Sequence, residues 1–461
     1  MNIIVADILE ILKMSKGGIE REKSIQEYIH KMMCTMVQKA FERLDDELWQ
    51  VHKRKGCHSL RRDERSLITS YGTIRLKRRL LKDANGKAFY PVDQEMGFRK
   101  YQRISPYFQY NIARIASKTV YRTTAMAVEV LTGTGLSHQQ IGNILHRVGN
   151  TYETWERVQR SQDIEPAAVL GQPEILRIEG DGVEIKGQGM KHLEIHRFQI
   201  AEGVERQGRR RVLTGVHCVA STSHKEAKEQ MQAYIETHYD LSRTLVLSNS
   251  DGGSGYSKEV FDKILGVTKR HEHFRDPYHV NKKGRDRLSF IPKKLTSKLQ
   301  RTIWEHDWKA VCTWLDTMES MAVNEQQSEQ VELYRRYLKR HWEYLTPLKL
   351  RGVELAEKGL GTCESGHRIY SYRMKKQGRR WGKQGGEAMI KIITGLRNGD
   401  LIEALDARDE YFNRRPSKEY KCAMRQIMKK HKIPHFGIQH GRIYCDCATS
   451  TAIGHLAKSF A

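Results

Sequence analysis

Residues 174–189 read EILRIEGDGVEIKGQG, and residues 244–253 read TLVLSNSDGG. Each contains a short apolar stretch that stops at an aspartate followed by glycine, which is typical of a buried strand with a polar group at its end. We expect the first to be one strand interrupted at its Gly-Asp-Gly. Because ligands bind at the ends of strands in open α/β sheets, Asp181 and Asp251 are predicted to lie at a functional site.

The segments around these two strands complete an α/β pattern. Further strands are expected over residues 192–203 and 209–220, and helices over residues 225–239 and 257–265. Three consecutive strands, a helix, a fourth strand and a helix is the order of a ribonuclease H-like fold, although alternation of strands and helices belongs to α/β proteins in general. Residues 287–358 are rich in helical patterns, which predicts a helical insertion.

Upstream of this core the sequence predicts an N-terminal α+β region. Residues 1–60 have the apolar spacing of a helical segment, and residues 61–105 contain three short strands that form a basic meander. The middle strand is expected to carry Arg75, Lys77 and Arg79 on one face. These side chains either grip DNA phosphates or form a solvated outer surface.

Residues 106–165 are expected to contain a helix-turn-helix, with a linker near residue 165. Two helical stretches flank a Gly-Thr-Gly break, Ser137 is a suitable N-cap, and the apolar residues after it repeat at the spacing of one buried helix face. The second helix would present its polar face to DNA, but two helices around a glycine turn are also a common packing element. The side chains expected to meet DNA are His138, Gln139, Gln140, Asn143 and Arg147.

The charge of the chain predicts a polyanionic partner. Among 461 residues, 80 are lysine or arginine and 55 are aspartate or glutamate, which leaves a net charge of +25. An excess of this size favours nucleic acid. A membrane surface would attract the same charge, but no apolar run approaches the roughly eighteen residues of a spanning helix, and the N-terminus lacks the basic start of a signal peptide. We therefore expect a cytoplasmic, nucleoid-associated protein without a membrane partner.

The cysteines indicate a reducing environment. All eight are scattered along the chain, without the dense and even spacing of a disulfide framework. One Cys-x-Cys pair lies downstream of three histidines in the basic C-terminal tail, residues 416–461. This group either binds zinc or consists of free thiols, since the spacing is not the usual one for zinc ligands. Its members are His431, His435, His440, Cys445 and Cys447.

With these features together, the chain resembles the DDE transposases of bacterial insertion sequences, specifically the ISLre-type group once filed as an uncharacterised, transposase-like family. The resemblance covers most of the chain. It rests on the basic YGTIRLKRR strand, the helix-turn-helix, the two aspartate motifs and RDPYHVNKK, and above all on residues 361–389, GTCESGHRIYSYRMKKQGRRWGKQGGEAM. It implies a ribonuclease H-like core in two parts, residues 166–286 and 359–415, separated by the helical insertion.

The resemblance further implies a catalytic centre of three acids, Asp181, Asp251 and Glu364, that hold two Mg²⁺ ions, with Mn²⁺ as a substitute. Glu387, on a following helix, is the rival for the third position. Two such ions about 3.5 to 4 Å apart stabilise both the attacking and the leaving oxygen of a phosphodiester displacement. The residues alone leave one alternative open, because an aspartate before glycine is also ordinary turn chemistry.

Other residues are expected to support this centre. Glu179 would point to the same side of its strand as Asp181, and Asp276 with His279 matches an Asp-x-x-His signature of related transposases. His279 either positions DNA or has a purely structural role. A basic run is expected to contact the DNA backbone, and its members are Arg373, Lys375, Lys376, Arg379 and Arg380. The neighbouring Tyr370, Tyr372 and Trp381 either stack on unpaired bases or are buried.

The predicted function is that of a DNA transposase. Water would attack at the ends of the mobile element, and the freed 3′ hydroxyl would then attack target DNA. The partners are double-stranded DNA, as element ends and as target, and further copies of the chain, since two ends must be held together. Two alternatives are a metal-dependent nuclease that does not join DNA and a non-catalytic DNA-binding regulator derived from a transposase.

Overall fold

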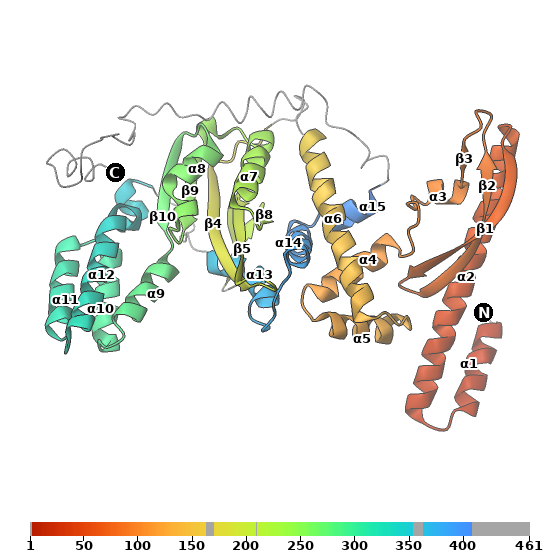
Figure 1. Cartoon of the computed structure of the whole chain (residues 1–461), viewed down its shortest axis with the longest axis horizontal. Coiled ribbons are helices and arrows are strands. Elements are labelled where there is room, and N and C mark those ends of the chain that lie inside the picture. The colour runs from red at the N-terminus through yellow and green to blue at the C-terminus, as the bar shows by residue number, and fades with distance from the viewer. Residues whose placement is uncertain (1, 163–169, 209, 354–362, 408–461) are drawn as a thin grey trace, which may run out of the picture. The chain divides into compact units, whose positions relative to one another are not determined.

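The structure is a computed structural model of the chain (Figure 1). The described ranges are 2–162, 170–208, 210–353 and 363–407. The predicted linker at residue 165 and the basic tail, with its histidines and cysteines, lie outside them. Among the described helices, none combines the length and the apolar character needed to cross a bilayer.

The N-terminal part consists of two helices and a three-stranded antiparallel sheet. The strand β1 begins at His58, just before the region 61–105 in which strands were expected, and it pairs with β2 down to a tight turn between Thr69 and Gly72. The third strand is short because Pro91 starts a helix directly after it. The elements are α1 (Asn2–Met14), α2 (Gly18–Arg54), β1 (His58–Thr69), β2 (Gly72–Lys82), β3 (Ala88–Phe89) and α3 (Pro91–Glu95).

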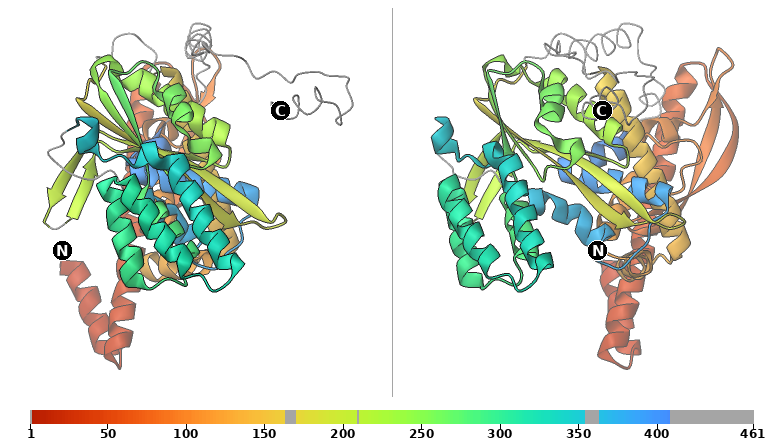
Figure 2. Two further views of the ribbon diagram at one scale, coloured as in Figure 1. Left: turned by 90° about the vertical axis from the view of Figure 1, so that its left-hand side faces the viewer. Right: turned by 60° about the vertical axis from the view of Figure 1, so that its left-hand side comes forward.

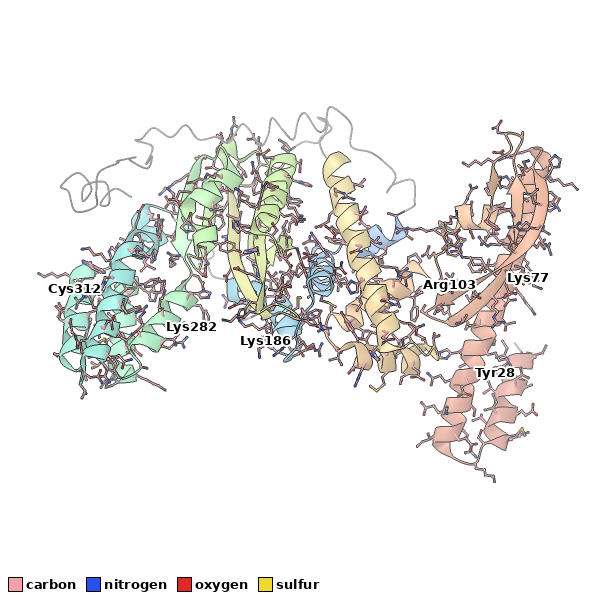
Figure 3. All side chains as sticks on the ribbon, viewed as in Figure 1. Tyr28, Lys77, Arg103, Lys186, Lys282 and Cys312 are labelled. Atoms are coloured by element: carbon pink, nitrogen blue, oxygen red, sulfur yellow. The ribbon has the colours of Figure 1, made fainter. Side chains whose placement is uncertain are left out.

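Arg79 differs from its predicted role. Its two terminal nitrogens pair with Asp45 and Asp46 of α2, at 2.5 and 2.6 Å. Arg75 and Lys77 are exposed, and Figure 3 shows the Lys77 side chain on this strand. Arg75 and Lys77 therefore remain on the exposed face of the strand. Arg79 does not, because it pairs with two aspartates of α2, some thirty residues earlier in the chain.

The region of the predicted helix-turn-helix contains two helices, α5 (Tyr121–Thr132) and α6 (His138–Gln162), which follow α4 (Pro106–Ala116). Gly133 ends α5 in the left-handed conformation. Before α6, the Gln140 N–H donates to Ser137 Oγ at 3.2 Å, and the Ser137 N–H donates to Gln140 Oε1 at 2.7 Å. This reciprocal cap confirms Ser137 as the N-cap. The helix continues to Gln162, beyond the residues where its periodicity was expected to end.

The central sheet has five strands in the order β10-β9-β4-β5-β8. β9 is parallel to both β4 and β10, whereas β5 is antiparallel to β4 and to β8. The segment of the chain between β5 and β8 forms a separate antiparallel ribbon of two strands, β6 and β7. The bounds are β4 (Ile175–Lys186), β5 (His192–Ala201), β6 (Gly203–Gln207), β7 (Arg210–Thr214), β8 (His217–Ser221), β9 (Leu245–Ser250) and β10 (Arg270–Arg275).

Three expectations about these strands were wrong. β4 is continuous through its Gly-Asp-Gly, because it pairs with β5 on both sides of Asp181. The stretches 192–203 and 209–220, each expected as one strand, contribute to two strands each. The fifth strand, β10, was not expected, because its sequence RHEHFR has no apolar pattern.

Helices cover both faces of the sheet. On one face, α7 (His224–His238) and α8 (Lys258–Leu265) share a core with Leu176, Ile178 and Phe198. On the other face, Val183 and Ile185 of β4 belong to a core with α4, α5, α6, α13, α14 and α15 (Figure 1). The helices not yet bounded are α13 (Cys363–Met374), α14 (Lys383–Asn398) and α15 (Leu401–Asp406), and the short 3-10 turns are η1 (Leu241–Arg243) and η2 (Ser254–Tyr256).

Between β10 and α13 the chain forms a helical group with a core of its own, which contains Val280, Leu299, Leu315 and Tyr334. Figure 2 shows these helices together. They are α9 (Pro277–Arg287), α10 (Lys293–Glu305), α11 (Trp308–Ser320) and α12 (Glu325–His341), followed by η3 (Trp342–Leu345) and η4 (Leu348–Arg351). The fold is thus mixed α/β, and its core strands and helices follow the order expected for a ribonuclease H-like core.

Candidate active site

Three aspartates stand in a row where the parallel pairing of three neighbouring strands ends. The register of the sheet aligns Gly180 of β4 with Ser250 of β9, and Ser250 with Arg275 of β10. The next residues along the chain are Asp181, Asp251 and Asp276. Neighbouring strands are about 4.8 Å apart and residues in parallel register face the same side, so this pattern directs three carboxylates to one face of the sheet. The Asp276 N–H donates to the Ser250 carbonyl at 2.9 Å, which extends the pattern by one residue.

Local backbone groups orient the two predicted catalytic aspartates. Asp181 is buried, with 5% of its surface exposed, and its Oδ1 accepts a hydrogen bond from the Gly182 N–H at 2.7 Å. Asp251 is half-buried, and its Oδ1 accepts from the Gly253 N–H at 2.8 Å. The backbone after each aspartate therefore fixes the orientation of its carboxyl group.

The negative charges of the aspartate row raise the pKa values of two nearby side chains, Tyr256 and His279. Burial raises the pKa of Tyr256, and the charges of Asp181, Glu194 and Asp251 raise it further. The pKa of His279 is raised by its hydrogen bond to Asp276, against an opposing effect of burial, and the charges of Asp181 and Asp251 add to the increase. Both aspartates are thus close enough to influence the same phenol and the same imidazole.

Asp276 and His279 form a local pair at the start of α9. Asp276 is the N-cap of this helix, and its Oδ2 lies 2.7 Å from His279 Nδ1. The Asp276 side chain is buried, whereas about a quarter of the His279 side chain is exposed. This geometry fits the predicted supporting role, since Asp276 already has an imidazole partner and so is less available as a ligand than Asp181 or Asp251.

In the loop after β9, Gly252 packs against the guanidinium of Arg275. Gly252 has φ +82°, and a Cβ atom at this position would lie 0.8 Å from Nη1 of Arg275. The Arg275 guanidinium donates to Nδ1 of His341 on α12 at 2.6 Å. Burial and the charge of Arg275 lower the pKa of His341 to about 4, which keeps its imidazole neutral. The helical group is thereby tied to the loop that carries Asp251.

Glu179 and Arg197 connect the row to the helix of the third predicted acid. Glu179 is buried on the Asp181 side of β4 and lies 3.6 Å from Arg197, which is the register partner of Asp181 on β5. Helix α13 packs against β4. A Cβ at Gly366, in its first turn, would lie 2.2 Å from Arg197 Nη1, so only glycine permits this approach.

The two candidates for the third acid differ in position. Glu364 belongs to the first turn of α13, beside the Arg197 pair, although its side chain lies outside the described residues. Glu387 lies on α14, where its Oε1 accepts from Thr222 Oγ1 at 2.7 Å. Thr222 follows β8, which is two strands away from β4 in the sheet. The placement of the backbone therefore favours Glu364.

The donor set suits Mg²⁺ in part. Carboxylate oxygens are the ligands that Mg²⁺ prefers, and Asp181 and Asp251 supply them from adjacent strands. Among the side chains that the structure describes, no group of three or more histidines, cysteines, aspartates or glutamates is placed to hold a metal ion. A complete centre therefore requires a ligand beyond them, and Glu364 is the candidate. The histidine and cysteine group predicted as a zinc site, residues 431–447, is also outside the described part.

The second helix of the predicted helix-turn-helix presents a polar face. His138, Gln139, Asn143 and Arg147 are exposed, whereas Ile141, Ile144, Leu145 and Val148 are buried. Gln140 is also exposed, but its side chain closes the N-terminal cap. The helix packs against α14 and shares its core, so this polar face is built directly onto the sheet domain.

The predicted basic run is divided by burial. Lys375, Lys376 and Arg380 are exposed, and Arg379 is half-buried. Arg373 is only 1% exposed, and its Nε donates to the Ala116 carbonyl at 2.6 Å. The expectation that Arg373 contacts the DNA backbone from the surface was therefore wrong, because α4 ends against it.

The aromatic residues of the same segment are divided as well. Tyr370 is fully buried and Trp381 is 6% exposed, with its Nε1 donating to the Met374 carbonyl at 3.0 Å. Tyr372 is exposed. Of the three aromatic residues that were expected either to stack on bases or to be buried, Tyr370 and Trp381 are thus buried.

A further basic surface adjoins the acidic row. Lys282, Lys283 and Arg285 are exposed on α9, the helix that Asp276 caps, and Figure 3 shows the Lys282 side chain. Sequence reasoning missed why this helix begins beside the site. The helix begins there because β10 runs parallel to β9 and ends directly before Asp276. The polar sequence of β10 does not predict a strand.

Comparison with known proteins adds a family. The model of an uncharacterised protein family, UPF0236, matches residues 18–409. A curated relative, the "UPF0236 protein in vanSb 3'region" of Streptococcus gallolyticus, is 35% identical over 457 residues, which cover 99% of each chain. Among solved structures, the "Drosophila P element transposase strand transfer complex" matches with a TM-score of 0.23 and 9% identity, over 74% of this chain and 95% of that one. A TM-score this low carries no weight for fold or function.

Proposed function

The chain belongs to the uncharacterised family UPF0236, and we propose that it is a DNA transposase whose ribonuclease H-like core cleaves and joins DNA with Asp181, Asp251 and Glu364. One observation supports the proposal above all others: two acids some 70 residues apart in sequence each follow the last register pair of two adjacent parallel strands and face the same side. An ordinary turn aspartate would have no reason to meet a second one there.

The chemistry follows from the donor set. Bound at these carboxylates, Mg²⁺ would supply the positive charge that stabilises the attacking and leaving oxygens of a phosphodiester displacement. The residues of the chain have the remaining tasks. Asp181 and Asp251 hold fixed negative charge, since each is oriented by a backbone N–H. Arg197 holds Glu179 beside them, and Asp276 fixes the His279 ring close to both aspartates.

The positive surfaces supply the means of holding DNA. Lys282, Lys283 and Arg285 on α9 are exposed next to the acidic row, and the polar face of α6 is exposed as well. With a net charge of +25, the chain attracts the phosphate backbone independently of sequence. Double-stranded DNA is therefore the proposed substrate, with two copies of the chain needed to bring two element ends together.

The test follows a labelled DNA end into a target. A duplex taken from the DNA that flanks the reading frame, labelled at the 5′ end of the strand whose 3′ hydroxyl would be freed and joined, is incubated with a supercoiled plasmid, the purified protein and Mg²⁺ or Mn²⁺. The proposal expects label to enter the plasmid with the wild-type protein and not with Asp181→Asn. Arg301→Gln on α10, an exposed residue, is the matched control and should retain activity.

Other outcomes separate the alternatives. Cutting without transfer of label would identify a nuclease. Binding of the duplex without any metal-dependent cutting would identify a regulator. Transfer that persists in Asp181→Asn would overturn the assignment of the acidic row.

A further inference from the structure

A cavity of about 770 Å³ lies between the starts of α5 and α6 and the segment after α13. Its volume is within the range of roughly 300–1,000 Å³ that small-ligand sites have. It is separate from the acidic row, and its wall includes Tyr121, His138, Arg373, Arg379 and Trp381. The chemistry of the proposed cleavage site does not account for it.

The wall of this cavity is strongly basic. It contains four arginines and one lysine, and none of the residues that line it is an aspartate or a glutamate. Arg373 and Arg379 repel each other: burial lowers the pKa of Arg373 to about 10, and the charge of Arg379 contributes to the decrease. Two guanidinium groups held close together without an acid make a site for an anion.

The buried arginines also have unused donors. Arg373 is only 1% exposed, and its guanidinium lies 4.8 Å from the ring centre of Trp381 and 5.6 Å from that of Tyr121. The Nη1 atoms of both Arg373 and Arg379 are buried and have no hydrogen-bond partner among the described residues. A buried charged donor without a partner costs free energy that a bound acceptor would recover.

We propose that this cavity binds one unpaired nucleotide of a DNA strand, with its phosphate on Arg373 and Arg379. A phosphate presents the paired oxygen acceptors that a guanidinium fork recognises. The cavity exceeds the size of a phosphate, and the amides of Gln188 and Gln384 in its wall can bond to the edge of a base. This inference rests on the proposed function for the identity of the ligand as DNA.

The surroundings favour a nucleotide within a strand over a free one. Lys375 and Lys376 are exposed in the segment that leads to Arg379, and His138 brings the start of α6 to the cavity. A strand that follows these residues would enter with its backbone already neutralised. A free nucleotide would gain nothing from charges outside the cavity.

The experiment compares two fluorescent duplexes of the same sequence, one blunt and one with a short unpaired 3′ tail, by anisotropy without metal. The wild-type protein is expected to bind the tailed duplex about tenfold more tightly, as expected for charge-assisted hydrogen bonds to a phosphate. Arg379→Gln should reduce this preference to less than about twofold, whereas Arg301→Gln, at an exposed position on α10, should leave the preference unchanged. Arg373→Lys, which keeps the charge but not the fork, should also weaken the preference.

Each other result has a defined meaning. Equal binding of both duplexes by the wild-type protein overturns the inference and leaves the proposed transposase function standing. Competition by inorganic phosphate or deoxyadenosine monophosphate that removes the tail preference at equal, low concentration also overturns it, in favour of a small-anion site. An Arg379-dependent preference in a protein that never cuts DNA supports the cavity and counts against the proposed function.

Discussion

Asp181 and Asp251 each follow the last register pair between β4 and β9, which is Gly180 with Ser250, and so extend from neighbouring parallel strands on the same face. The charges of both aspartates raise the pKa of the same imidazole, that of His279. Their proximity is a property of the sheet, since the segments between them form two further core strands, a ribbon and a helix. Their role as metal ligands remains a prediction.

Loss of either aspartate should weaken metal binding. Asp181→Asn and Asp251→Asn keep the shape of the side chain and remove one negative ligand, so Mn²⁺ affinity, measured by calorimetry on the free protein, should fall at least about tenfold. Affinity for duplex DNA without metal should not decrease, because each variant removes a negative charge. Glu305→Gln, at an exposed position on α10, is the control. Unchanged Mn²⁺ affinity in both variants would contradict the site.

The choice of third acid can be decided by two matched variants. Glu364→Gln, in the helix that packs on β4, should reduce strand cleavage at least about a hundredfold, in line with the loss of one group that stabilises a developing charge. Glu387→Gln should retain cleavage within a few-fold, because its partner is Thr222 beside β8. The reverse pattern would transfer the catalytic role to Glu387.

Substitution of Gly252 should destabilise the loop of Asp251. Gly252→Ala imposes a left-handed φ on alanine and displaces the Arg275 guanidinium, so we expect a loss of about 2–3 kcal/mol in the free energy of unfolding, measured by urea denaturation. Gly189→Ala is the control, because Gly189 has φ +75° with no atom within 4 Å of the added carbon. Its cost should be only about 1 kcal/mol. Equal losses of unfolding free energy in the two variants would show that the Arg275 guanidinium can move aside without destabilising the fold.

The His279 and Asp276 pair should stabilise the fold in a pH-dependent way. The pKa of His279 is raised, so its contribution is fully present below the ordinary histidine pKa, about 6.5, and is lost as pH rises through the raised value. Relative to His279→Gln, the wild-type protein should therefore be more stable at about pH 6 than at about pH 9, by roughly 1 kcal/mol. Urea unfolding of both proteins at the two pH values measures this. A difference that grows with pH would be the wrong sign.

Asp400 should likewise lower the free energy of unfolding as pH rises, but through a buried carboxyl instead of a histidine. Burial raises the pKa of this carboxyl to about 7, so its ionisation opposes folding, and stability is lost as pH rises from the unfolded-state value of about 4 towards 7. Asp400→Asn is expected to raise the free energy of unfolding by about 1–2 kcal/mol at pH 8.5 and by less at pH 5. Thermal melts at both pH values are sufficient. Glu305→Gln, at an exposed position on α10, is the control and should show little change at either pH.

The sequence by itself determined the features that depend on one element at a time. The apolar stretches before Asp181 and Asp251 place each acid near the end of a strand pairing, and the cap at Ser137 places the start of α6. These signals are local, because burial along one strand or one helix face imposes its own period on the residues.

Only the tertiary structure decided which elements meet. RHEHFR became a strand because β9 offers it a parallel partner, although its own side chains have no apolar period. The side chains of Arg79 and Arg373 were expected on the outer surface, but Arg79 pairs with Asp45 and Arg373 donates to the Ala116 carbonyl, groups distant in the chain. The period of a sequence shows whether a side chain tends to face inward or outward, but its partner depends on contacts between distant segments.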